Sequence, residues 1–424
     1  IPLRLVGSEM CIRDRFYSAS AELRTQYKND QEVKKIIDIA LGLEGLRRQD
    51  GIHAAAVVIS PEAITNFLPV QKKGKDAELV TQYEMHTVEQ LGLLKMDFLG
   101  LRNLSIIDRT VKLINKDDFN IDDVPLNDDK TFELFSSGRM IGVFQLESRI
   151  AQITARSLKP SRFEDIVALV ALIRPGPLGA NMHIEFADRA RGKKEIEFLH
   201  EDLKEILEET YGVILYQEQV MQIAQRISGF QLDEADDLRK AMGKKIPKVM
   251  EQQRKKFTDG AVTNGYSEQF SIELFDQIAF FAGYGFNKSH SVPYALIAYQ
   301  TAYLKANYPA EYLSACLTAV KRDKDRTAIF LSEARELGVN VKTPNINLSI
   351  EDFSVANGEI LFGLSAIRNV GDITAEKIVL ERENGAYETI QDFLSRTDSR
   401  SLNKRGVEAM IQGGAFDQFG FPRR

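Results

Sequence analysis

The stretch that decides the fold is residues 91–98, LGLLKMDF, whose composition is typical of a β-strand. Successive side chains of a strand point to opposite faces. Lys95 and Asp97 are therefore predicted to share one face. The apolar side chains are predicted on the other: Leu94, Met96 and Phe98. A buried strand that carries a cation and a carboxylate side by side must have a reason for both. A lone aspartate on a strand is, however, more often structural than catalytic.

Two segments on either side of this strand predict a small α+β region. Residues 54–59, AAAVVI, predict a second, buried strand. Residues 30–48 predict an amphipathic helix that Asp30 can cap. Its apolar stripe consists of Val33, Ile36, Ile37, Ala40, Leu41 and Leu43. Gly100 closes the 91–98 strand, and a helix is predicted to follow. Its apolar residues are Leu104, Ile106, Ile107, Val111, Leu113 and Ile114.

Beyond about Asn127 the pattern is mainly helical. Loops are predicted at residues 174–178 (RPGPL), at Gly243 and at residues 283–290 (GYGFNKSH). Two short strands are predicted around residues 354–361. A near-duplication of helix–turn–helix character closes the sequence, at residues 364–382 and 402–416. The fold class is thus mainly α, with an α+β remnant near the 91–98 strand.

Composition excludes several classes of protein. The net charge of −6 argues against a uniformly basic nucleic-acid binder, although residues 239–256 form a basic run. Such a run is usually a solvated face. The two cysteines, Cys11 and Cys316, are too few for a cysteine zinc cluster and suggest a reducing compartment. No secretory signal and no run of about 18 apolar residues occurs, so a membrane span is not expected.

The first fifteen residues, IPLRLVGSEMCIRDR, have neither helical nor strand periodicity and do not start with Met. They resemble a translated sequencing-adapter string, and residues 1–15 are therefore set apart as a probable non-native artefact. The sequence closes on FPRR at residues 421–424 without obvious terminal structure. Both ends are expected to be cuts in a longer protein.

Several long strings, in order, resemble the family C replicative DNA polymerases, the bacterial polymerase III alpha subunits. Near the strand these are GIHAAAVVIS (51–60) and GLLKMDFLGLRNLSII (92–107). Further on they are VFQLESR (143–149), ALIRPGPL (171–178), YGVILYQEQVMQIAQ (211–225), DLRKAMGKK (237–245), FAGYGFNKSHSVPYALIAYQTAYLK (281–305) and YPAEYLSA (308–315). Such a series is far more specific than one short motif.

The resemblance implies a catalytic role for Asp97. In that family the matching aspartate is the third of three carboxylates that hold two Mg²⁺ ions, and Lys95 matches a lysine that approaches the incoming triphosphate. The other two aspartates belong to an Asp-x-Asp-x-Asp type motif, which this sequence lacks. A two-metal site is not expected to assemble from one carboxylate. The chain alone is expected to be inactive.

The resemblance also implies dNTP-binding residues in a fingers domain. Arg239 and Lys240 match a basic pair, more often two arginines in the family, and Lys244 could share their face unless Gly243 ends the helix first. The 283–290 loop is implied to line the nucleotide pocket. Its candidate side chains are Asn287, Lys288, Ser289 and His290. The alternative for the segment with Arg239 and Lys240 is a solvated helix. The alternative for the 283–290 loop is a plain turn between two helices. The other histidines show no ligand spacing: His53, His86, His183 and His200.

The carboxy-terminal region has a helix-hairpin-helix signature, with Val370 and Gly371 in the turn. In such turns glycine lets backbone N–H groups approach a DNA phosphate. Asn369 stands where many such modules have another glycine. A plain helical hairpin is the alternative reading.

Four segments follow from this interpretation: the 1–15 artefact, the end of the thumb and the C-terminal part of the palm (16–101), the fingers (102–350) and a truncated tandem helix-hairpin-helix region (351–424). The implied activity is template-directed nucleotidyl transfer from dNTPs to a primer 3′-hydroxyl. Expected partners are primer–template DNA, dNTPs and, in the longer protein, the sliding clamp and other replisome subunits, in the bacterial cytoplasm and not at a membrane. A non-catalytic DNA-binding paralogue in a replisome or repair complex is the alternative.

Overall fold

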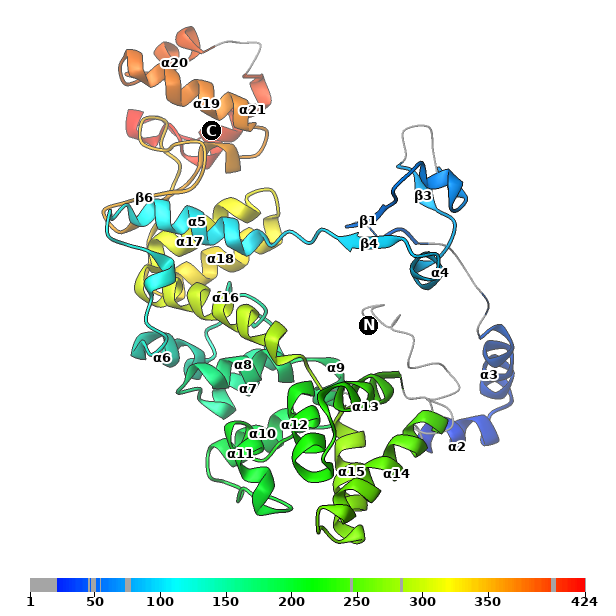
Figure 1. The fold of residues 1–424 in the computed structure, drawn as a ribbon. Coiled ribbons are helices and arrows are strands. Elements are labelled where there is room, and N and C mark those ends of the chain that lie inside the picture. Colours follow the sequence, from blue (N-terminus) through cyan, green and yellow to red (C-terminus); the bar gives the residue numbers. More distant parts are fainter. Residues whose placement is uncertain are drawn as a thin grey trace. The chain divides into compact units, whose positions relative to one another are not determined.

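The computed structural model describes residues 21–44, 46, 51–53, 55–72, 78–244, 247–282, 285–397 and 402–423. The segment 1–15, predicted to be an artefact, lies outside these residues. The chain divides into two compact units, the first ending at Gly100 and the second beginning at Leu101 (Figure 1). The predicted fold class is confirmed, since helices dominate and strands are few and short.

The first unit begins with two helices, α2 (Ala21–Asn29) and α3 (Gln31–Leu43). The predicted cap is confirmed, because the Asp30 carboxylate accepts hydrogen bonds from the backbone N–H groups of the first turn of α3. The helix ends at Leu43, earlier than predicted. The remaining elements are β1 (Ala56–Ile59), β2 (Val70–Gln71), β3 (Val80–Thr81), α4 (Met85–Gln90) and β4 (Leu94–Asp97).

Both predicted strands form, and they pair with each other. β1 and β4 are antiparallel, with Ala56 opposite Asp97 and Val58 opposite Lys95. The prediction that these strands are buried is wrong. One face of the pair is exposed in the described chain, at 40–62% of each side chain surface: Val57, Ile59, Leu94, Met96 and Phe98. A two-stranded sheet has only one face against the small core of this unit, which contains Leu68, Val88 and Leu93.

The second unit begins with α5 (Arg102–Ile114), the helix predicted after Gly100. The helices that follow are α6 (Asp129–Ser137), α7 (Arg149–Leu158), α8 (Phe163–Leu172), α9 (Pro175–Gly179) and α10 (Met182–Ala190). The predicted loop at 174–178 is wrong, because most of it is the short helix α9. Pro175 occupies the first helical position of α9, where its missing N–H costs nothing.

A second group of helices packs around its own core. It comprises α11 (Lys204–Leu207), α12 (Gln217–Ser228), α13 (Leu232–Lys244), α14 (Pro247–Thr263) and α15 (Glu268–Ala282). The predicted loop at Gly243 is not seen there, since α13 runs on to Lys244.

The long helix α16 (Lys288–Asn307) ties two cores together. Ala295, Ala298 and Tyr299 belong to the core with α6, α7 and α8, whereas Leu304 belongs to the core with α5 and the next helices. Those helices are α17 (Pro309–Val320) and α18 (Lys324–Glu336). In Figure 1, α17 lies beside α5. The fully buried Lys305 at the end of α16 donates to the Glu333 carboxylate of α18 at 2.6 Å.

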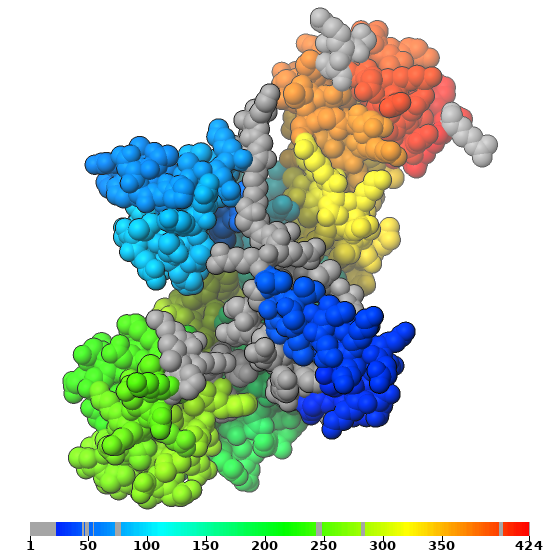
Figure 2. All heavy atoms as spheres, turned by 90° about the vertical axis from the view of Figure 1, so that its right-hand side faces the viewer, coloured from blue at the N-terminus to red at the C-terminus, as the bar shows by residue number. Residues whose placement is uncertain are grey.

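The C-terminal part contains a three-stranded sheet and a last helical core. β6 (Ser354–Ala356) and β7 (Glu359–Leu361) form the predicted hairpin, which turns through Asn357 and Gly358, both with positive φ. β5 (Val341–Lys342), which was not predicted, adds parallel to β7. The last helices are α19 (Asp372–Glu381), α20 (Ile390–Arg396) and α21 (Lys404–Gly413). These helices pack around a core of their own, and their segments appear orange to red in Figure 2.

Candidate functional site

Asp97 and Lys95 share a face of β4, as strand alternation predicts. Lys95 Nζ donates to Asp97 Oδ1 at 2.6 Å. His53 Nδ1 lies 3.7 Å from the same oxygen, a neighbour that sequence spacing did not reveal. A cavity of about 930 Å³ lies beside this group, and His53, Lys95 and Phe98 line it. The three polar side chains make one small electrostatic cluster at the end of a strand.

The Lys95 ammonium holds the pKa of the Asp97 carboxyl below its ordinary value. The hydrogen bond from Lys95 is the largest cause, and the charges of Lys95 and His53 act in the same direction. Asp97 is therefore an anion at neutral pH, and its side chain keeps 40% of its surface exposed. An ionised, accessible carboxylate is the form that ligates a hard divalent cation.

The donors around Asp97 do not complete a magnesium site by themselves. Mg²⁺ requires six oxygen ligands in near-octahedral geometry and is usually bound through one or two carboxylates, waters and phosphates. Asp97 supplies a single carboxylate, and Lys95 and His53 are its other polar neighbours. Within the described ranges, no group of three His, Cys, Asp or Glu side chains is placed to hold a metal ion. A magnesium site at Asp97 would therefore need carboxylates other than those of the described residues around it.

The predicted basic pair lies on α13, where Asp236 holds both cations. Arg239 Nε donates to Asp236 Oδ1 at 2.8 Å, and Lys240 Nζ lies 2.8 Å from Asp236 Oδ2. These hydrogen bonds lower the pKa of Asp236 and raise the pKa of Lys240. Lys244 is the last residue of α13, and its side chain lies outside the described residues.

The predicted glycine-rich loop becomes the first turn of α16 from Lys288 onward. Asn287 caps the helix by accepting a hydrogen bond from the His290 N–H at 2.9 Å. The Glu218 carboxylate accepts from the backbone N–H of Lys288, with both oxygens at 2.9 Å, and from the N–H and hydroxyl of Ser289 at 3.3 Å. A fixed anion thus satisfies the positive end of this helix.

The side chains of this turn also have partners. Lys288 Nζ donates to Glu209 Oε2 at 2.6 Å and lies over the Tyr216 ring. His290 packs against Phe286, and the Arg174 guanidinium lies 4.3 Å from the centre of the Phe286 ring. Burial lowers the pKa of Arg174. Sequence reasoning placed Arg174 in the RPGPL motif but gave it no role.

Gln217 joins the two predicted nucleotide-binding segments. Its Oε1 accepts from Arg239 Nη1 at 3.3 Å, and its Nε2 donates to the Gly285 carbonyl at 3.2 Å. Its backbone N–H donates to the Phe286 carbonyl at 2.9 Å. One side chain on α12 therefore fixes α13 and the start of α16 to each other. The motif YQEQ at 216–219 is part of the family resemblance, but nothing in its spacing indicates that Gln217 contacts residues 22 and 68 positions away.

The candidate DNA-binding turn precedes α19, and its first helix differs from the prediction. Residues 364–366 form a 3₁₀ turn, not an α-helix. Asn369 adopts the left-handed conformation (φ 66°), which asparagine tolerates better than most residues. Gly371 has φ −83°, and a side-chain Cβ there would meet only Thr374 Oγ1, at 4.0 Å. The space next to the Gly371 Cα is therefore open.

Asp97 and Lys95 belong to the first unit, whereas the other candidate residues belong to the second. Within the second unit, Gln217 and Glu218 bring the α13 and α16 candidates together. Val370 belongs to the C-terminal core, and Gly371 is the exposed N-cap residue of α19.

Three models of known families match successive segments of this chain. A family model described as the bacterial DNA polymerase III alpha NTPase domain matches residues 4–100. One described as the bacterial DNA polymerase III alpha subunit finger domain matches residues 103–265. A third, described as a helix-hairpin-helix motif, matches residues 338–424. The resemblance in the sequence motifs is thereby confirmed: the chain belongs to the bacterial DNA polymerase III alpha subunit family.

Individual relatives carry the name DNA polymerase III subunit alpha. The protein from Thermus aquaticus is 46% identical over 409 residues, which cover 94% of this chain and 33% of the relative. That from Mycobacterium tuberculosis is 42% identical, covering 96% of this chain and 35% of the relative. The protein from Escherichia coli K12 is 44% identical, and the match covers 95% of this chain and 36% of the relative. The chain spans about a third of the length of the curated relatives it matches. No helix among the described residues is long and apolar enough to cross a membrane.

Proposed function

We propose that this chain supplies the nucleotide-binding fingers, one catalytic carboxylate and a DNA-binding hairpin of a replicative DNA polymerase. The longer protein would transfer nucleotidyl groups from dNTPs to a primer 3′-hydroxyl on a template. The observation that carries this proposal is the Gln217 bridge, which links Arg239 to the residues preceding α16. It joins the two segments that hold the candidate triphosphate-binding donors.

The chemistry of these donors suits a triphosphate. Phosphoryl-type transfer depends on positioning and on stabilising negative charge more than on covalent chemistry. The Arg239 guanidinium can bind a phosphate through two N–H groups, and Lys240 and Lys288 add point charges. Each is now paired with a carboxylate, Asp236 or Glu209. A triphosphate carries more charge than a carboxylate and can compete for the same donors.

Asp97 is the proposed metal ligand of the longer protein. Mg²⁺ bound there would stabilise the attacking and leaving oxygens of the transfer. Asp97 would contribute one ionised carboxylate, and Lys95 would orient it and face the triphosphate. The two other carboxylates would come from a segment whose motif this sequence lacks.

The turn at Val370 and Gly371 is proposed to contact the phosphates of duplex DNA. Asn369 supplies the left-handed turn, and open space lies in front of Gly371. Such contacts are independent of base sequence and sensitive to salt. We place the longer protein in the bacterial cytoplasm at the nucleoid, with primer–template DNA, dNTPs, the sliding clamp and other replisome subunits as partners.

The proposal is tested in a chimera in which residues 16–424 replace the matching third of the Escherichia coli relative. Arg239→Ala is expected to raise the KM for dNTP about tenfold or more, because a charged hydrogen bond to phosphate is lost. Arg254→Ala is the matched control, since Arg254 lies on α14 and pairs with Asp276 at 2.7 Å. Equal KM values for the two variants would contradict the assignment. A folded chimera that binds primer–template but adds no nucleotide would favour the non-catalytic paralogue instead.

A further inference from the structure

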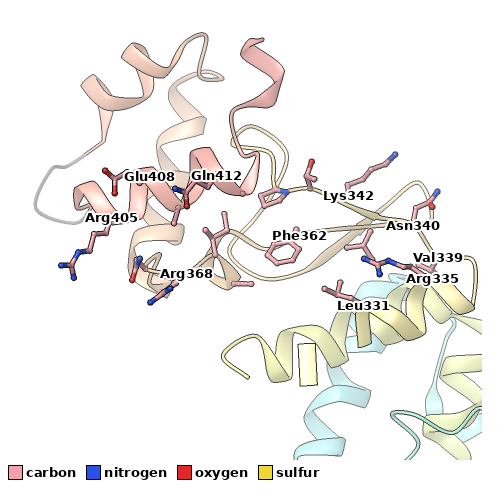
Figure 3. Close-up of a pocket in the computed structure, with 18 of the residues that line it drawn as sticks. Leu331, Arg335, Val339, Asn340, Lys342, Phe362, Arg368, Arg405, Glu408 and Gln412 are labelled. Carbon is pink, nitrogen blue, oxygen red and sulfur yellow. The ribbon is translucent and has the colours of Figure 1, made fainter. Parts of the chain in front are cut away.

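A cavity of about 840 Å³ lies within the second unit, between α18, the edge strand β5 and α21. Its volume falls in the range of ligand pockets, about 300–1,000 Å³. Figure 3 shows side chains from three separate elements around it: Leu331 and Arg335 from α18, Lys342 from β5, and Arg405, Glu408 and Gln412 from α21. The proposed polymerase function uses none of these side chains.

The charge around this cavity is unbalanced. Four cations line it against one carboxylate, Glu408: Arg335, Lys342, Arg368 and Arg405. Glu408 is itself paired with Lys404 at 3.7 Å, and Lys342 with Glu359 at 3.1 Å. Among the described residues, the side chains of the three arginines have no ion pair or hydrogen-bond partner. Three arginines without counterions around one cavity favour an anionic ligand.

An aromatic ring and several amides complete the lining. Phe362 lines the cavity, and its ring packs against Phe353 with ring centres 4.7 Å apart. Asn340, Asn369 and Gln412 offer amide donors and acceptors. Sites for single-stranded nucleic acid combine basic side chains for the backbone with an aromatic face on which a base stacks. An added peptide strand is disfavoured, since β5 offers an edge of only two residues, Val341 and Lys342.

We infer that this cavity binds a few nucleotides of single-stranded DNA. The phosphates lie against Arg335, Arg368 and Arg405, and one base stacks on Phe362. Arg368 immediately precedes the Asn369 turn, so a strand in the cavity is continuous with the surface proposed to bind duplex DNA. The inference needs only the cavity and its charges, and it holds whether or not the longer protein transfers nucleotides.

Binding of a labelled twelve-nucleotide oligo-dT to the purified 424-residue chain tests this inference. The double variant Arg335→Ala/Arg405→Ala is expected to weaken binding at least about tenfold at low salt. Loss of two phosphate contacts is also expected to reduce the slope of log affinity against log salt by about 1.4. Arg191→Ala is the matched control, because Arg191 is an exposed arginine at the end of α10, far from this cavity in sequence. An unchanged affinity and slope in the double variant would overturn the inference.

A second measurement locates the bound base. It uses the wild-type chain, so its result does not depend on whether a variant folds. An oligo-dT with one 5-iododeoxyuridine is crosslinked to the wild-type chain with light, and the modified peptide is sequenced. The expected crosslink is to Phe362, and salt should suppress it. Crosslinks found only outside the cavity would overturn the inference, as would displacement of the oligo-dT by poly-glutamate at lower concentration than by unlabelled oligo-dT. Neither outcome would alter the KM test of the Arg239 assignment.

Discussion

At the scale of single residues, carboxylates hold the candidate phosphate-binding groups in place. Asp236 pairs with Arg239 and Lys240, and Glu218 caps the first turn of α16. A partner of this kind fixes a long side chain or a helix end before a ligand arrives, which lowers the entropic cost of binding. In the proposed function, a triphosphate would replace Asp236 and Glu209 as the partner of these cations.

Glu218 is expected to be a positioning residue. Glu218→Ala leaves the first N–H groups of α16 without their acceptor, and should lower the free energy of unfolding of the chain by about 1–3 kcal/mol. Glu218→Gln keeps one acceptor oxygen and should lose less than half as much. Glu205→Gln is the control, because Glu205 is an exposed glutamate that lines, together with Glu218, a cavity of about 580 Å³. Urea unfolding followed by circular dichroism measures all three, and an Ala variant as stable as the control would refute this role.

The ion pair between Lys95 and Asp97 is expected to depend on pH. Lys95 lowers the pKa of Asp97 in the folded chain, so their pairing is present above the ordinary pKa of 3.8 and is lost as pH falls through the lower, folded value. The ¹³C carboxyl resonance of Asp97 should therefore titrate below 3.8. Lys95→Met should move the midpoint upward. A midpoint at or above 3.8 in the wild-type chain would show that the pair does not form in solution.

At the scale of elements, Lys321 fastens the C-terminal region to the end of α17. Its ammonium donates to Asp352 at 2.7 Å, to the Ser365 hydroxyl at 2.9 Å and to Asp372 at the start of α19. The side chain keeps only 17% of its surface exposed, so water screens these contacts poorly. Lys321 thus connects the end of α17 to the segment before β6 and to the candidate DNA-binding turn before α19.

Lys321→Met is expected to loosen this connection. Losing several charged hydrogen bonds in a partly buried setting should lower the free energy of unfolding by about 1–3 kcal/mol. Lys324→Met, at an exposed position of α18, should change it by less than about 0.5 kcal/mol. Hydrogen exchange of α19 amides gives the local readout. Equal exchange in the two variants would mean that Lys321 does not fasten α19.

The turn before α19 gives a prediction for DNA binding. Gly371→Ala introduces a Cβ into open space, with Thr374 Oγ1 as its nearest neighbour at 4.0 Å, and so should leave stability unchanged. The Cβ should keep a phosphate from the backbone N–H and weaken duplex binding about tenfold. Gly42→Ala, which also faces open space, is the control. Equal duplex affinities of the two variants, measured by fluorescence anisotropy, would argue against the hairpin assignment.

At the scale of the whole molecule, local patterns were predictable and long-range partners were not. Alternation placed Lys95 beside Asp97, the Asp30 cap followed from residue type, and two short strands around residues 354–361 were predicted. The prediction that β4 is buried was wrong. Its apolar residues indicate a strand that other side chains cover, but no described residues cover that face. The Glu218 cap of α16 joins residues about 70 positions apart, and no periodicity encodes such a pair.

The chain by itself is expected not to extend primers. Asp97 is a single carboxylate, and the described residues place no group of three His, Cys, Asp or Glu side chains around a metal ion. Gel-based extension of a labelled primer by the purified chain, with Mg²⁺ and all four dNTPs, should yield no product above a no-enzyme control. Extension that Asp97→Ala abolishes would contradict this expectation.

The central claim is that Asp97 is a catalytic carboxylate of a polymerase to which this chain contributes the fingers. Single-turnover nucleotide incorporation by the chimera tests it most directly. Asp97→Asn should lower the rate by at least about a thousandfold while primer–template affinity stays within about twofold, because a metal ligand acts on the transition state. Asp108→Asn, which removes an exposed carboxylate paired with Lys112, should leave the rate unchanged. A chimera that incorporates nucleotide equally fast with Asp97→Asn would contradict the account.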